Sequence, residues 1–104
     1  MTDRHYAPRA RLMLVATPDV ESAIDRERHH GRRVGALVRA SRGSDDTDVR
    51  YSRMAADAAG YATQLFAALH ALDDAGCDVV IVEYVPATPE WLGVRDRLER
   101  AARR

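Results

Sequence analysis

Lysine is absent from this chain of 104 residues, in which all sixteen basic side chains are arginines. The absence excludes chemistry that needs a lysine amine, such as Schiff-base catalysis or phosphate binding by a P-loop lysine. We attribute the bias to the codon usage of a GC-rich, bacterial genome. Sixteen acidic side chains balance the arginines, so no net charge attracts the protein to nucleic acid or to an anionic membrane.

Cysteine and long hydrophobic runs are scarce as well. The single cysteine, Cys77, excludes an internal disulfide and a thiolate metal cluster, which favours a reducing cytoplasm. No apolar run approaches the roughly twenty residues that a membrane-spanning helix needs. Residues 1–10 also lack the apolar core of a signal peptide. We therefore predict a cytoplasmic protein with no membrane partner.

Several motifs that bind cofactors or metals are missing. The first turn between a strand-like run and a helix reads VATPDV and contains no glycine, which argues against a conventional site for NAD or FAD. A P-loop, a G-x-S-x-G elbow and a zinc-protease helix are also absent. His29 and His30 are adjacent, so on a helix they point about 100° apart and cannot share a metal ion. We predict neither cofactor nor metal.

Aromatic side chains are few, at 6% of the chain. None lies within the arginine cluster of residues 26–33, whereas sites for single-stranded nucleic acid interleave basic and aromatic residues. We interpret the cluster as a solvated face. Contact with a protein, or with a small anionic or nucleotide-like ligand, ranks above direct binding of nucleic acid, and a homodimer is left open.

The residues that are present describe one folded domain, because 46% are hydrophobic and 31% are charged. Strand-like apolar runs alternate with helical patterns, which is typical of a parallel sheet covered by helices. The order predicts an α/β fold, a small Rossmann-like three-layer α/β/α sandwich with a mainly parallel sheet. We expect strands within residues 11–17, 32–40, 49–52 and 77–85, and helices over residues 18–30, over 54–74 and after Thr88. Residues 1–10 form a linker-like tag, and residues 11–104 form the domain.

Three local features refine this prediction. Thr17 and Thr88 each precede a proline, so we expect both residues to cap a helix. Gly35 lies inside an apolar run, where a neighbouring group can approach the backbone closely. Cys77 has no histidine nearby in sequence to activate it, so we interpret it as a small buried hydrophobic residue rather than a nucleophile.

Glu83 is the most informative candidate for a site. It lies near the carboxyl end of a strand, where open α/β sheets bind their ligands. The functional interpretation makes Glu83 an acid/base or ligand-binding group. The structural alternative, which base rates favour, is a carboxylate that holds a nearby backbone segment or an arginine.

Four stretches of the sequence resemble one known family. They are RHYAP at residues 4–8, GRRVGALV at 31–38, AGYATQLFAALHALDDAGCDVVIVEYVP at 59–86, and LGVRDRLERAA at 92–102. Together they resemble the C-terminal domain of the long form of threonylcarbamoyl-AMP synthase, which makes the activated intermediate for threonylcarbamoyladenosine in tRNA. The resemblance implies a Rossmann-like fold and a role in tRNA modification.

In that family a catalytic domain precedes this one and binds threonine, bicarbonate and ATP. The chain begins with Met1 inside what resembles the interdomain linker, so we expect the catalytic domain to be absent. By the resemblance, Arg4, His5, Tyr6 and Pro8 match the linker segment that gates the catalytic cleft.

Three functional interpretations follow, of which we favour the first. The chain is a binding or regulatory module that docks onto a separate catalytic synthase domain through Arg4, His5, Tyr6 and Pro8. Alternatively, it is a small stand-alone enzyme or ligand-binding protein of a specialised biosynthetic pathway, with His5, Tyr6 and Glu83 as its acid/base groups. The third interpretation is an inactive remnant or fragment. The first makes the protein a non-enzyme.

Overall fold

The computed structural model describes residues 9–41 and 48–103. Four parallel strands form one sheet in the order β1-β4-β2-β3. Val15 lies opposite Glu83, and Leu37 lies opposite Val82. The elements are β1 (Arg11–Val15), η1 (Thr17–Asp19), α1 (Val20–His29), β2 (Val34–Val38), β3 (Arg50–Arg53), α2 (Ala58–Asp74), β4 (Val79–Glu83), η2 (Pro89–Trp91) and α3 (Leu92–Ala102).

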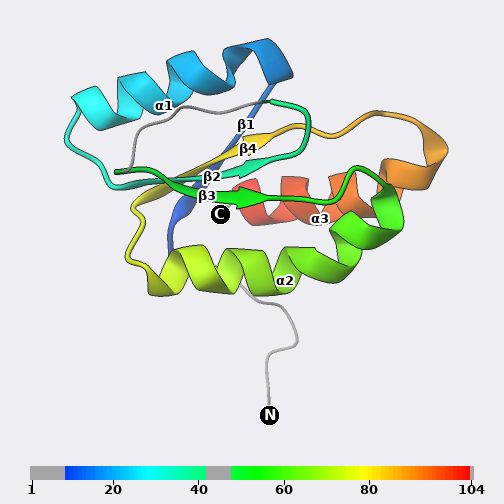
Figure 1. Ribbon diagram of the computed structural model, residues 1–104. Helices are drawn as coiled ribbons and strands as arrows, with labels where there is room; N and C mark the ends of the chain where they lie inside the picture. The colour runs from blue at the N-terminus through cyan, green and yellow to red at the C-terminus, as the bar shows by residue number, and fades with distance from the viewer. Residues whose placement is uncertain (1–8, 42–47, 104) are drawn as a thin grey trace.

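The sheet lies between two layers of helices (Figure 1). Helix α1 covers one face, and α2 and α3 cover the other, so the chain forms a three-layer sandwich. Strands β2 and β4 occupy the centre of the sheet, and all five residues of each are buried. Burial on both faces explains why these strands read as continuous apolar runs without alternation. The predicted α/β fold is confirmed.

Each face of the sheet has its own hydrophobic core. The core under α2 and α3 includes Tyr61, Leu65, Leu69 and Leu72 of α2, which recur at helical spacing and are all buried. The core under α1 contains Val20 and other aliphatic side chains from the helix and the sheet. Ala10, at the end of the expected tag, is 5% exposed and belongs to the first core.

The long helix starts later than the sequence predicts. It begins at Ala58 instead of Met54, because Asp57 occupies the N-cap position and its Oδ2 accepts a hydrogen bond from the Gly60 N–H at 3.0 Å. Met54 is instead buried, and its N–H donates to the Val38 carbonyl at 2.8 Å, which extends the pairing of β2 with β3. The predicted helix boundary at Met54 is therefore wrong.

The predicted threonine cap is wrong for Thr17, and for Thr88 it is right in position only. Thr17 is the first residue of η1 and its hydroxyl donates to Glu83 across the sheet edge. Thr88 occupies the N-cap position of η2, but its side chain makes no capping hydrogen bond. In both cases a short 3-10 turn beginning at or next to the proline precedes the α-helix.

Gly35 in β2 marks a close approach, as the sequence predicts. A Cβ added there would lie 2.9 Å from the Cys77 sulfur and 3.1 Å from a Leu72 methyl carbon. Cys77 is 8% exposed, so its interpretation as a small buried residue is confirmed, and burial raises the pKa of its thiol. The small residue at position 35 lets α2 and the Cys77 side chain pack directly on the sheet.

The Gly35→Ala variant should therefore be less stable. We expect overpacking against Cys77 and Leu72 to lower the free energy of unfolding by about 1–3 kcal/mol, measured by urea denaturation. Gly93→Ala is the matched control, because a Cβ at Gly93 meets no atom within 4 Å. Gly93 lies in α3, so this second variant should be as stable as the wild type or more stable, by up to roughly 1 kcal/mol. Equal effects of both substitutions would contradict the packing argument.

Candidate functional site

The candidate site lies at the carboxyl ends of β2 and β4, around the side chain of Glu83. This residue ends β4 and is 0% exposed. Its Oε2 accepts a hydrogen bond from the Thr17 hydroxyl at 2.6 Å. Its Oε1 accepts from the backbone N–H groups of Arg39, Ala40 and Ser41 at 2.6, 2.9 and 3.0 Å.

These hydrogen bonds decide the ionisation of Glu83. Burial alone would raise the pKa of the carboxyl. The hydrogen bonds from Thr17 and from the three backbone N–H groups outweigh burial and lower the pKa below its ordinary value. Glu83 is therefore a carboxylate at neutral pH, held by its own chain.

The segment that follows β2 is held from both sides. Its N–H groups bind Glu83, and the Arg53 guanidinium donates to the carbonyls of Arg39 and Ser41 at 3.5 and 3.1 Å. Three consecutive N–H groups that point at one oxygen are an arrangement that can bind an anion. In this protein the internal carboxylate of Glu83 occupies it.

Arg39, Trp91 and Tyr61 pack beside this carboxylate. The Arg39 guanidinium carbon lies 5.2 Å from the centre of the Trp91 ring, and Trp91 contacts Tyr61 edge to face with 5.5 Å between ring centres. Burial and then the charge of Glu83 raise the pKa of Tyr61, and the charge of Arg39 offsets only part of this rise. Tyr61 is fully buried, and its hydroxyl has no partner in the described part of the chain. It therefore stays protonated and cannot serve as a base at neutral pH.

A second polar cluster follows β4, and sequence analysis missed it. The Tyr84 hydroxyl donates to the Glu99 carboxylate. The Arg95 guanidinium carbon lies 4.3 Å from the centre of the Tyr84 ring, and its Nη1 donates to the Val85 carbonyl at 3.0 Å. Burial, followed by the hydrogen bond to Glu99, raises the pKa of Tyr84. The i,i+4 spacing of Arg95 and Glu99 was the only sequence signal, because Tyr84 is fifteen residues from Glu99.

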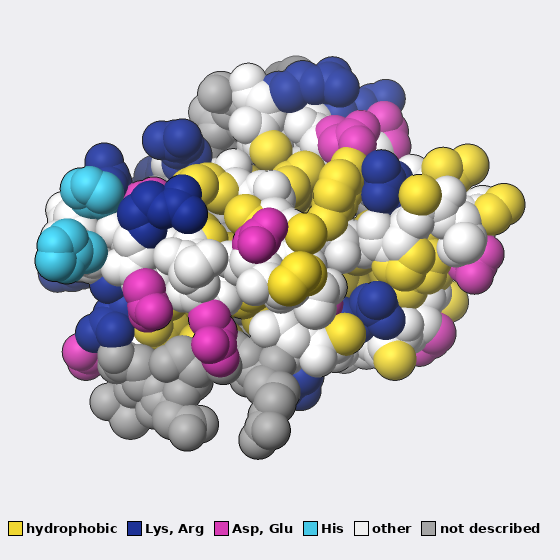
Figure 2. Space-filling view, turned by 90° about the horizontal axis from the view of Figure 1, so that it is seen from above, with side chains coloured by type: hydrophobic (Ala, Val, Ile, Leu, Met, Phe, Trp, Pro, Cys, Tyr) yellow, Lys and Arg dark blue, Asp and Glu magenta, His cyan; other side chains and the backbone are white. Residues whose placement is uncertain are grey.

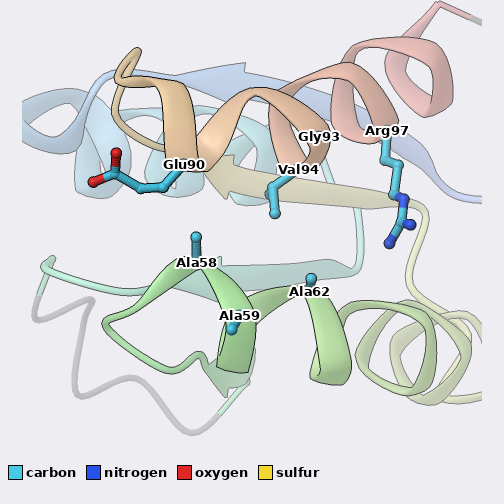
Figure 3. A pocket seen from close by; sticks show the side chains of 7 residues that line it. All are labelled: Ala58, Ala59, Ala62, Glu90, Gly93, Val94 and Arg97. Atoms are coloured by element: carbon cyan, nitrogen blue, oxygen red, sulfur yellow. The ribbon is translucent and has the colours of Figure 1, made fainter.

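A groove of about 320 Å³ separates the first turns of α2 and α3 (Figure 3). Alanines of α2 form one wall and Val94 points in from α3, while Glu90 and Arg97 lie at opposite ends. The lining contains no hydroxyl, thiol or imidazole. Its residues are Ala58, Ala59, Ala62, Glu90, Gly93, Val94 and Arg97. The groove therefore has a mainly apolar lining with two charged side chains and no nucleophile.

The face covered by α1 carries charges of both signs (Figure 2). Histidine side chains lie at one end of this face, where His29 and His30 are exposed. The His30 ring nitrogen Nδ1 lies 2.8 Å from the Arg26 carbonyl, to which it can donate. Among residues 9–41 and 48–103, no group of three or more His, Cys, Asp or Glu side chains could hold a metal ion.

The remaining predicted site residues are Arg4, His5, Tyr6 and Pro8, and all four lie outside the described residues. The structure therefore describes Glu83 alone among the predicted site residues. In the described part of the chain, no helix is both long enough and apolar enough to cross a membrane.

The fold and the site define a class of protein: a small Rossmann-like α/β domain in which an internal carboxylate occupies the sheet edge at the carboxyl ends of β2 and β4. A family model described as the C-terminal domain of threonylcarbamoyl-AMP synthase matches residues 1–103. The chain belongs to this family.

Relatives from Pyrococcus abyssi cover almost the whole chain. Threonylcarbamoyl-AMP synthase of Pyrococcus abyssi is 32% identical over 108 residues, which cover 98% of this chain and 31% of that protein. The crystal structure of P. abyssi Sua5 complexed with L-threonine superposes with a TM-score of 0.80 at 30% identity, over 98% of this chain and 31% of that one. The chain thus spans about a third of the length of these relatives.

Two further solved structures are similar. The C-terminal Sua5 domain of Pyrococcus horikoshii gives a TM-score of 0.68 at 29% identity, covering 89% of this chain and 93% of that one. A P. abyssi Sua5 variant, in which an adjacent histidine and tyrosine are replaced by alanine, gives a TM-score of 0.78 at 28% identity. The match covers 91% of this chain and 28% of that one. The P. horikoshii structure therefore contains little besides the domain that this chain matches.

Replacing Glu83 by glutamine should destabilise the protein and change its response to acid. Folding lowers the pKa of Glu83 below 4.5, so the carboxylate contributes stability above that value that is lost as the pH falls through the lower, folded pKa. At pH 7 we expect Glu83→Gln to lower the free energy of unfolding by about 1.5–3 kcal/mol, because charge-assisted hydrogen bonds are lost. The difference from wild type should shrink as the pH falls through this lowered pKa.

Urea denaturation at pH 7 and at acid pH measures both effects. Glu90→Gln is the control, because Glu90 is exposed and its replacement should change stability by less than about 0.5 kcal/mol at either pH. A deficit of Glu83→Gln that does not depend on pH would show that the charge of Glu83 contributes nothing.

Proposed function

We propose that this protein is an accessory module that docks onto a separate catalytic domain of a threonylcarbamoyl-AMP synthase. The observation that carries the proposal is the match to the C-terminal domain over residues 1–103, within a chain that spans about a third of a whole synthase. The pathway served would be the threonylcarbamoyl modification of tRNA.

The described site supports a binding role rather than catalysis. The oxygens of Glu83 already accept four hydrogen bonds from their own chain, and the residue is fully buried. A carboxylate in that state cannot reach a substrate to exchange a proton. The stand-alone enzyme with Glu83 as an acid/base group is therefore the weaker proposal, and Glu83 instead fixes the loops at the sheet edge.

The docking segment is proposed to be Arg4-His5-Tyr6-Ala7-Pro8. His5–Tyr6 is the only adjacent histidine–tyrosine pair in the sequence. A pair of the same two residues was replaced in the P. abyssi variant named above. That replacement supports the choice of this pair as part of the docking segment. An aromatic ring, an imidazole and a guanidinium within three residues can stack and hydrogen-bond in a partner's cleft.

The test mixes the full chain with a separately produced catalytic domain of a threonylcarbamoyl-AMP synthase. We expect saturable binding by calorimetry, and a changed rate of adenylate formation from threonine, bicarbonate and ATP. The double variant His5→Ala/Tyr6→Ala should weaken binding at least tenfold without changing thermal stability, because both residues precede the first strand.

The matched control is His29→Ala/His30→Ala, an exposed pair at the far end of α1, which should bind like the wild type. Equal affinities for wild type and His5→Ala/Tyr6→Ala would exclude the segment as the docking element. No binding by the wild type would exclude the accessory role, and turnover by the chain alone would favour the stand-alone enzyme.

A further inference from the structure

Asp73 occupies an electrostatically unfavourable place in the fold. It lies in the last turn of α2, where the helix dipole presents its negative end and carboxylates are disfavoured. Its side chain is only 10% exposed, so water does little to stabilise the charge. A carboxylate in this position needs hydrogen-bond donors from elsewhere in the protein.

The donors come from the start of the described chain, more than sixty residues away in sequence. Asp73 Oδ1 accepts hydrogen bonds from the backbone N–H groups of Arg9 and Ala10, both at 3.1 Å. The Arg9 Nε lies 3.5 Å from Oδ2, but the Arg9 side chain is 81% exposed, so this ion pair contributes little. The contact is therefore a backbone clamp, set mainly by Oδ1.

The clamp is continuous with the folded domain. Ala10 is buried in the core beneath α2 and α3, and the Arg11 N–H donates to the Asp78 carbonyl at 3.1 Å. Residues 9–11 are thus fixed by hydrogen bonds from three successive backbone N–H groups. Arg9 directly follows Arg4-His5-Tyr6-Ala7-Pro8 in sequence, so the clamp fixes the residues to which that segment is attached.

We propose that Asp73 is a positioning residue that fixes this attachment point and so determines how the segment is presented to the partner. The inference rests on the proposed function. Fixing two junction residues before binding removes conformational entropy that docking would otherwise have to remove. Loss of the clamp should weaken docking without altering any residue that contacts the partner.

Three variants of the full chain separate this role from a general effect of charge. Asp73→Ala removes the acceptor and should weaken binding to the catalytic domain about tenfold. Asp73→Asn keeps an oxygen at Oδ1 and should restore most of the affinity. Asp74→Ala removes the neighbouring, exposed carboxylate at the same helix end, and should bind like the wild type.

Two further measurements test the mechanism. In the free protein, the Arg9 and Ala10 amides should exchange with deuterium faster in Asp73→Ala than in wild type or Asp74→Ala. In a double-mutant cycle, Asp73→Ala should have no further effect on binding when His5 and Tyr6 are already alanine. An undiminished effect in that background would assign Asp73 a structural role and overturn the inference.

The outcomes distinguish this inference from the proposed function. If the wild type binds the catalytic domain and Asp73→Ala binds it equally well, the inference fails and the accessory role stands. If the wild type itself does not bind, the accessory role fails first. Failure of Asp73→Asn to recover affinity would also overturn the clamp, because the oxygen that accepts both N–H groups would be present.

Discussion

The buried carboxylate of Glu83 is the interaction on which the carboxyl edge of the sheet depends. It ends β4 and binds the Thr17 hydroxyl after β1 and three N–H groups after β2. One side chain thus joins the ends of three neighbouring strands. The groups that donate to it lie 42 to 66 residues away in sequence. The cost of burying a charge is offset because every bond comes from a group that the fold already fixes.

This arrangement changes what the Rossmann-like topology can do. Doubly wound sheets commonly bind ligands at the carboxyl ends of their central strands, with N–H groups supplied by the loops. Here β4 and β2 are the central strands, and the N–H groups of residues 39–41 bind Glu83. An incoming anion would have to displace an internal carboxylate with a lowered pKa. The N–H groups at this edge are therefore unavailable to an external anion. This favours a role through surface contacts.

The fold and the place of Glu83 at a strand end could be predicted from sequence because they follow from periodicity. The hydrogen-bond partners of Glu83 could not, because they depend on long-range pairing. The burial of β2 and β4 and the helical spacing from Tyr61 to Leu72 reflect local patterns. Thr17 looked like a helix cap because its true acceptor, Glu83, is 66 residues away. Asp73 gave a weak signal, an acid at the wrong end of a helix, whose explanation lies 63 and 64 residues earlier.

Glu83 and Asp73 are two carboxylates with little exposure to water, and each needs hydrogen-bond donors from the protein. The chain has sixteen arginines, yet both carboxylates accept hydrogen bonds from backbone N–H groups. An arginine partner would have to give up side-chain entropy to hold one geometry, whereas a backbone N–H fixed by the fold gives up little more. Such contacts hold chain segments in place and leave no charge poised for chemistry. Carboxylates used in this way fix chain segments of the domain and leave its surface for contacts with a partner, in agreement with the accessory role proposed above.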